Sequence, residues 1–196
     1  MMEYSWVGID PGKSGAMVVL FSDDSMLVYD LSECYDGSGA AQTSINPVKF
    51  RDLVVDNFGV LLEEKEVLVC CEKPIFVGGG FTIKTPMSMF ESYGVIRTVF
   101  ESVGVGFKGI RPRDWIRFYP DLYHPKQKRD KSESIVKAKE LFPDSSDMFE
   151  YTVLKGRYKG TIIGLDGRAE AALIANYARS LHFTVDSFED KELSDE

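Results

Sequence analysis

The chain has 196 residues, of which 44% are hydrophobic, and a formal net charge of −8. This length favours one domain with a sizeable core. Apolar runs fall short of the roughly 20 residues of a membrane helix, and Glu3 and Pro11 interrupt the first one, which argues against a membrane protein and a signal peptide. The three cysteines lack metal-site spacing, which indicates reduced thiols and a cytoplasmic location.

Hydrophobic periodicity and turn signals predict five strands, with helices between the later ones. The strands are expected at residues 4–10, 15–21, 26–31, 66–72 and 105–110. The helices are expected at residues 47–58 (ended by Gly59), 86–103, 112–118, 131–141 and 166–181. Residues 144–163 are expected to be irregular. Three consecutive strands imply an antiparallel meander, and the later alternation of strands and helices adds parallel strands. The predicted fold class is therefore α/β, with a mixed five-stranded sheet flanked by helices.

The average charge hides an asymmetry along the chain. Between Lys108 and Lys139 there are ten basic and four acidic residues, whereas the remainder has 13 basic and 27 acidic residues. A basic segment on an acidic body suits a polyanion bound on one face, although a solvated charged face has the same pattern. Residues 186–196 hold six acids and one lysine. We therefore expect a folded domain over 1–183 and an acidic, disordered tail over 184–196.

Four carboxylates are placed at the ends of predicted buried elements. Asp10 ends the first strand and Glu72 ends the fourth. Asp166 and Glu170 are four residues apart and share one face of the last helix, which is otherwise apolar. Such a cluster would repel itself unless cations offset its charge. Oxygen ligands without nearby His or Cys favour Mg²⁺ or Mn²⁺ over zinc.

Each acid alone also suits a structural role. These roles are a turn for Asp10, an ion pair with Lys73 for Glu72 and a helix cap for Asp166. For Glu170 the structural role is an ion pair with Arg168 or with a solvent-side lysine. A phosphate-binding loop at residues 12–14 is excluded, because Val7 stands where the Walker pattern requires glycine and a strand follows.

Five stretches of the chain resemble, in order, motifs of the RuvC-type Holliday junction resolvases, in particular their phage-borne branch. They are GIDPGKSGAM, CCEKP, RPRDWIRFY, DKSESIVKAKELFP and DGRAEAALIANYA, and the resemblance covers residues 6 to about 180. The resemblance implies an RNase H-like fold, a homodimer in a bacterial host cytoplasm, and recombination or repair of DNA. It also implies symmetric nicking of four-way junctions with two Mg²⁺ ions per active site, leaving 5′-phosphate and 3′-hydroxyl ends.

The resemblance assigns Asp10, Glu72, Asp166 and Glu170 as catalytic metal ligands. The last two acids are four residues apart here and commonly three apart in bacterial members, and both spacings keep the pair on one helical face.

DNA contacts are predicted from the basic segment and from a glycine-rich loop. Lys131 resembles a family lysine near the active site, and Phe76 and Phe81 lie in the loop that probes the junction core in the family. Phosphate contacts are expected from Arg111, Arg113, Lys126, Lys128 and Arg129. Trp115 matches a family tryptophan and suits the core better than a base-stacking role, and helix 86–103 is a candidate dimer element.

Other functions remain possible at this point. The sugar-kinase and actin-like ATPases share the ancestral fold but need two such domains, and this length supplies one. A ribonuclease acting on RNA–DNA hybrids would share the metal site, and a non-catalytic junction-binding protein would share the fold.

Overall fold

The computed structural model describes residues 4–36, 44–64, 66–75, 84–124 and 130–192, and the side chains of all of these except 58–64, 84–86 and 182–192. Five residues that the sequence predicts to bind DNA lie outside the described residues. They are Phe76, Phe81, Lys126, Lys128 and Arg129.

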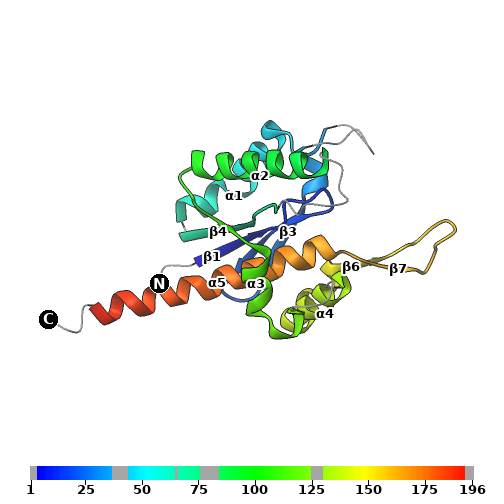
Figure 1. Cartoon of the computed structure of the whole chain (residues 1–196). Helices are drawn as coiled ribbons and strands as arrows, with labels where there is room; N and C mark the ends of the chain where they lie inside the picture. The colour runs from blue at the N-terminus through cyan, green and yellow to red at the C-terminus, as the bar shows by residue number, and fades with distance from the viewer. Residues whose placement is uncertain (1–3, 37–43, 65, 76–83, 125–129, 193–196) are drawn as a thin grey trace.

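One five-stranded sheet forms the centre of the domain (Figure 1). Its strands are β1 (Tyr4–Ile9), β2 (Ala16–Phe21), β3 (Met26–Asp30), β4 (Glu66–Glu72) and β5 (Gly106–Ile110). Their order is β3-β2-β1-β4-β5. Strand β2 is antiparallel to β1 and β3, whereas β4 is parallel to β1 and β5. The predicted mixed sheet, with three antiparallel strands followed by parallel ones, is confirmed.

Helices cover both faces of this sheet (Figure 1). On one face lie α1 (Pro47–Glu64) and α2 (Lys84–Ser102). On the other, α5 (Asp166–Glu192) packs against β1, β2 and β4, next to α3 (Pro112–Phe118) and α4 (Lys131–Leu141). Short 3₁₀ helices η1 (Leu31–Cys34) and η3 (Pro120–Leu122) complete this part of the fold. None of the helical segments that the structure describes is long and apolar enough to cross a membrane.

The core is divided into two layers because strand side chains alternate between faces. Cys70 packs in the layer beneath α5, and Cys71 packs in the layer beneath α1 and α2. Both thiols and that of Cys34 are buried and free, as predicted. Burial raises the pKa of the Cys70 thiol to about 12, so this thiol is protonated at neutral pH.

Two helices are longer than predicted. Helix α1 continues past Gly59 to Glu64, because one interior glycine costs a helix about 1 kcal/mol and does not by itself end it. Helix α5 continues past Leu181 to Glu192, and neither glycine nor proline occurs between Arg168 and Glu192. No break in the helix therefore marks the predicted boundary at residue 183.

The prediction of irregular structure over residues 144–163 is wrong. A 3₁₀ helix, η4 (Pro143–Phe149), is followed by an antiparallel hairpin of β6 (Glu150–Thr152) and β7 (Ile162–Gly164). Strands of three residues are too short to show alternation in the sequence. Gly156 and Gly160 both have φ of +86°, the left-handed region that favours glycine, and allow the chain to turn between the strands.

Candidate active site

Two of the four predicted carboxylates come from neighbouring parallel strands. Strands β1 and β4 pair in register up to Ile9 and Cys71, so Asp10 and Glu72 are the next residues at the same edge of the sheet. Ile9 and Cys71 face α1 and α2, and alternation therefore directs Asp10 and Glu72 to the face covered by α5. Burial is the main cause of the raised pKa of the Cys71 thiol, and the charges of both carboxylates add to it. The two acids therefore lie close to the same residue.

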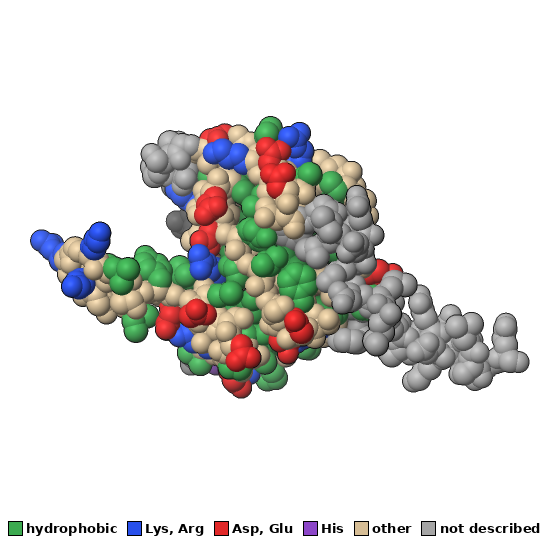
Figure 2. Space-filling view, turned by 180° about the vertical axis from the view of Figure 1, so that it is seen from behind, with side chains coloured by type: hydrophobic (Ala, Val, Ile, Leu, Met, Phe, Trp, Pro, Cys, Tyr) green, Lys and Arg blue, Asp and Glu red, His purple; other side chains and the backbone are tan. Residues whose placement is uncertain are grey.

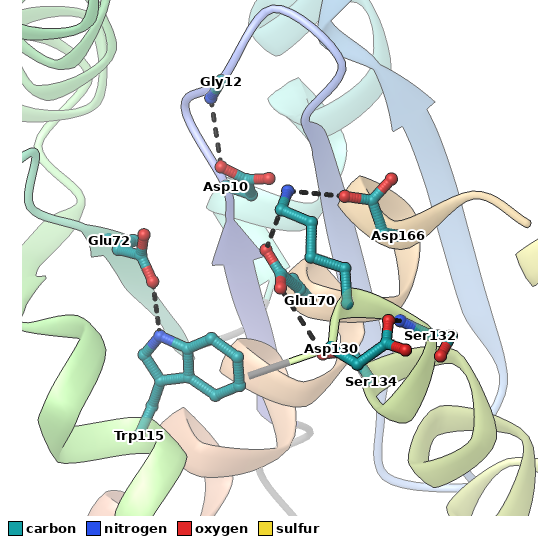
Figure 3. A network of polar contacts seen from close by, with 10 residues as sticks. Asp10, Gly12, Glu72, Trp115, Asp130, Ser132, Ser134, Asp166 and Glu170 are labelled. Atoms are coloured by element: carbon teal, nitrogen blue, oxygen red, sulfur yellow. Dashed lines mark hydrogen bonds and ion pairs between the residues drawn. The ribbon is translucent and has the colours of Figure 1, made fainter. Parts of the chain in front are cut away.

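Helix α5 brings the other two carboxylates to this edge, because glycines allow it to approach the sheet closely. A Cβ on Gly8 of β1 would lie 2.1 Å from the carbonyl oxygen of Ala171 in α5. A Cβ on Gly167, in the first turn of α5, would lie 2.0 Å from a carbonyl oxygen of the β1–β2 loop. This close packing places Asp166 and Glu170 beside the end of β1 (Figure 3).

A lysine lies among these carboxylates. The Nζ of Lys131, the first residue of α4, is 2.5 Å from Oδ2 of Asp166 and 4.0 Å from Oε2 of Glu170. Burial alone would lower the pKa of Lys131. The hydrogen bond to Asp166 and the charges of Glu170, Asp166 and Asp10 outweigh it and raise the pKa. The ammonium is therefore charged at neutral pH, and Asp10 belongs to the same electrostatic cluster as the acids of α5.

Trp115 holds the fourth carboxylate. Its side chain is completely buried, which confirms the interpretation of Trp115 as a core residue. Its Nε1 donates a hydrogen bond of 2.6 Å to Oε2 of Glu72 (Figure 3). The sequence analysis missed this positioning contact. A buried indole N–H usually has an acceptor, which is the signal that could have indicated it.

Asp10 and Glu170 also accept hydrogen bonds from neutral donors. The backbone N–H of Gly12 donates to Oδ1 of Asp10 at 3.1 Å. The buried hydroxyl of Ser134, on α4, donates to Oε1 of Glu170 at 3.4 Å. The hydrogen bond from Gly12 to Asp10 is typical of an aspartate that stabilises a turn. Asp10 therefore has the structural role that the sequence suggested, and it also lies in the carboxylate cluster.

The alternative ion pair between Glu170 and Arg168 does not form. Arg168 instead donates from Nε and Nη2 to the two carboxylate oxygens of Asp30, at 2.7 and 2.6 Å. Helical neighbours two residues apart point in different directions, which explains the difference. Glu170, of which only 5% is exposed, lies 4.0 Å from the Nζ of Lys131, in agreement with the alternative of an ion pair with a lysine.

The donor set of the cluster suits a hard divalent cation, because four carboxylates supply only oxygen ligands. Among the described residues, however, no three Asp, Glu, His or Cys side chains form a group arranged to hold a metal ion. Lys131 binds Asp166, and Trp115 binds Glu72 on the other side of Asp10 (Figure 3). The residues of the predicted site thus lie at one edge of the sheet, with the Lys131 ammonium beside the two carboxylates of α5.

The predicted DNA-binding residues that the structure describes lie beside this cluster or within it. Lys131 is part of it. Arg111 and Arg113 are exposed at the start of α3, the helix that carries Trp115. Arg111 forms a two-pronged ion pair with Asp114, at 2.9 Å for each bond. Contact of these residues with DNA stays a prediction.

Replacing Trp115 with Phe tests its positioning role. Loss of the indole N–H leaves Glu72 less restrained, and we expect the Mg²⁺ concentration for half-maximal nuclease activity to rise about tenfold. The measurement is a metal titration of the cleavage rate. The matched control is Trp6→Phe, because Trp6 lies in the same core layer and its ring contacts Tyr4 and Arg179 and not Glu72. An unchanged metal requirement in Trp115→Phe would contradict the positioning role.

The direction of the strands decides the fold class. In the order β3-β2-β1-β4-β5, β2 runs opposite to the other four strands. The fold is RNase H-like.

Comparison with solved structures finds similar chains, among them the following three structures of two proteins. The RuvC of Thermus thermophilus in complex with a Holliday junction substrate has a TM-score of 0.49 and 14% identity, with 89% of this chain and 90% of that chain covered. The structure of Thermus thermophilus RuvC has a TM-score of 0.49 and 15% identity, with 91% and 96% covered. The yeast mitochondrial Holliday junction resolvase Ydc2 has a TM-score of 0.43 and 14% identity, with 86% and 75% covered.

No protein-family model matches the chain, and a sequence search of curated proteins finds no match. Function is therefore inferred from the residues of the site.

Proposed function

We propose that this chain is a structure-selective endodeoxyribonuclease that cuts four-way and other branched DNA junctions. The observation that carries the proposal is the gathering of Asp10, Glu72, Asp166 and Glu170, from two strands and a helix, at one edge of the sheet. Carboxylates in this number are costly to desolvate and have no evident structural purpose together. The motifs that resemble RuvC-type resolvases contain all four of these residues.

The four carboxylates are the proposed holders of Mg²⁺ or Mn²⁺, two ions per site. When bound, the ions would supply an activated water in line with the phosphorus and would stabilise the departing 3′ oxygen, leaving a 5′-phosphate. Trp115 and the N–H of Gly12 orient Glu72 and Asp10 by the hydrogen bonds described above. Glu170 is held by Ser134.

Lys131 is proposed to exchange partners when DNA binds. Its ammonium offsets the carboxylates in their present arrangement, and its side chain is 60% exposed. An exposed lysine has the freedom to turn from Asp166 to a phosphate of the bound strand. That exchange would release Asp166 and Glu170 to hold a metal ion while keeping a positive charge beside the reacting phosphate.

A homodimer is part of the proposal, because a two-fold axis would place one such site on each of two opposed strands of a junction. Helix α2 supports a contact of this kind. Its Met87 and Phe90 side chains are apolar and exposed, and methionine and aromatic residues are enriched at protein–protein interfaces.

The proposed activity predicts the outcome of a cleavage assay with Mg²⁺ on three substrates of matched sequence. They are a synthetic four-way junction, a linear duplex and an RNA–DNA hybrid. We expect symmetric nicks in the junction that DNA ligase can reseal, and little cutting of the duplex. Preferential cutting of the hybrid would instead indicate a ribonuclease. Tight binding of the junction without cutting would indicate a non-catalytic junction-binding protein.

A further inference from the structure

The β6–β7 hairpin leaves the body of the protein as an arm (Figure 1), and β7 ends two residues before Asp166 of the carboxylate cluster. We define the arm as residues 150–164. It begins directly after the buried Phe149, and at its other end the N–H of Leu165 donates to the carbonyl oxygen of Phe149 at 2.8 Å. The next residue is Asp166. The root of the arm is therefore closed by a hydrogen bond and adjoins the proposed active site.

The root of the arm is also fixed to α4. Glu150 forms an ion pair of 2.5 Å with Lys139. A Cβ on Gly164 would lie 2.4 Å from Cδ1 of Ile135, so the backbone of β7 lies directly against that side chain. Because α4 begins at Lys131, the arm is anchored to the two helices that supply Lys131, Asp166 and Glu170.

Beyond its root, the arm exposes apolar side chains that the body does not cover. Leu154 is 76% exposed and Tyr158 is 66% exposed. The exposed large apolar side chains of the arm are Tyr151, Leu154, Tyr158, Ile162 and Ile163. A two-stranded hairpin is only marginally stable in water, and a cluster of exposed apolar groups usually marks a binding surface.

The outer end of the arm is positively charged. Lys155, Arg157 and Lys159 lie within five residues, and the arm contains no acid other than Glu150, which is paired with Lys139. Figure 2 shows Lys and Arg side chains at the end of the arm and hydrophobic side chains along it. Three cations on a protein of net charge −8 complement a polyanion. Tyrosine and leucine beside them suit contact with sugars or base faces.

We propose that residues 150–164 are a DNA-binding arm that contacts the backbone of the duplex branch leading away from the cut phosphate. This inference rests on the proposed function. Val153 exchanges backbone hydrogen bonds with Thr161 and Gly160, and residues 157–160 form the turn, so the paired part of the arm is four residues long and rises about 13 Å from its root at about 3.3 Å per residue. At about 3.4 Å per base pair, the cations of the turn, which lie beyond this paired part, contact phosphates at least about four base pairs from the cut.

Neutralising the three cations tests the arm. The variant Lys155→Gln/Arg157→Gln/Lys159→Gln is compared with its parent by fluorescence anisotropy on a labelled four-way junction, both carrying Asp10→Asn to prevent cutting. We expect the affinity to fall at least about tenfold at 100 mM salt. We also expect the slope of log K against log salt to become shallower by about 2 to 3, close to 0.9 for each lost phosphate contact.

The control neutralises exposed cations on the opposite face of the sheet. It is Lys49→Gln/Arg51→Gln, on α1, where each cation is exposed and paired with an acid. We expect its affinity and salt slope to equal those of the parent. Circular dichroism and the melting temperature of both variants should also match the parent, because all five side chains lie on the surface.

The results of these binding experiments distinguish a failure of the arm proposal from a failure of the proposed function. If the parent binds the junction and the arm variant has the same affinity and salt slope, the arm proposal is overturned and the proposed function stands. If the parent does not bind the junction, the proposed function fails. If DNA binding is unchanged while the mass measured by sedimentation is halved, the arm contacts a second copy of the chain and not DNA.

Discussion

Asp10→Asn and Glu72→Gln are each expected to abolish cleavage of a four-way junction. Both changes keep the size of the side chain and remove the negative charge on which the proposed metal site depends. Loss of one such ligand should raise the barrier by roughly 4 kcal/mol, which lowers the cleavage rate about a thousandfold. The affinity of each variant for the junction should stay within about threefold of that of the unmodified protein, because the cations proposed to contact phosphate are unchanged.

Single-turnover cleavage and anisotropy on the same junction measure the two effects separately. The control is Asp52→Asn, the same chemical change at an acid of α1 that pairs with Arg51. We expect it to cleave like the unmodified protein. Full activity of Asp10→Asn or of Glu72→Gln would remove that residue from the reaction.

Gly8→Ala is expected to have the largest effect on stability. The added methyl group would lie 2.1 Å from the carbonyl oxygen of Ala171 and 2.2 Å from the backbone nitrogen of Ala175. Backbone atoms of a packed helix cannot rotate away, so α5 must move off β1. We expect a loss of at least about 3 kcal/mol, a large part of a typical free energy of unfolding of 5–15 kcal/mol. Cleavage should be lost as well, because α5 carries Asp166 and Glu170.

Urea unfolding followed by circular dichroism measures this loss. The control is Gly94→Ala, in the exposed middle of α2, where an added Cβ would meet nothing within 4 Å. That substitution should raise the free energy of unfolding by up to about 1 kcal/mol, because alanine favours helix over glycine. A Gly8→Ala variant as stable as the unmodified protein would mean that α5 and β1 do not pack as described.

The carboxylates of the strands could be predicted because their placement follows from local pattern and topology. Asp10 and Glu72 end apolar strands, and the carboxyl ends of parallel neighbours meet at one edge of a sheet. The contacts of Lys131 and Trp115 could not be predicted in this way. They join elements 35 and 43 residues apart in the chain, and they depend on how α3 and α4 are oriented on the sheet. The sequence carries no periodic signal for that orientation.

The arm escaped sequence analysis for a different reason. Its paired strands have three residues each, and nine residues lie between them, so neither alternation nor a tight-turn signal is visible. The charges at its end were visible as Lys155, Arg157 and Lys159, but a basic cluster alone does not indicate whether the chain projects from the body.

Because α5 packs closely on β1, the hydrophobic core beneath α5 and the proposed active site are expected to unfold as one cooperative unit. Ala171, Ala172 and Ala175 fill the interior from the same helix that presents Asp166 and Glu170 at its first turns. Local melting of the centre would therefore require the hydrophobic interior to open with it. Thermal inactivation should coincide with global unfolding, in contrast to enzymes whose reactive groups sit on loops that loosen first.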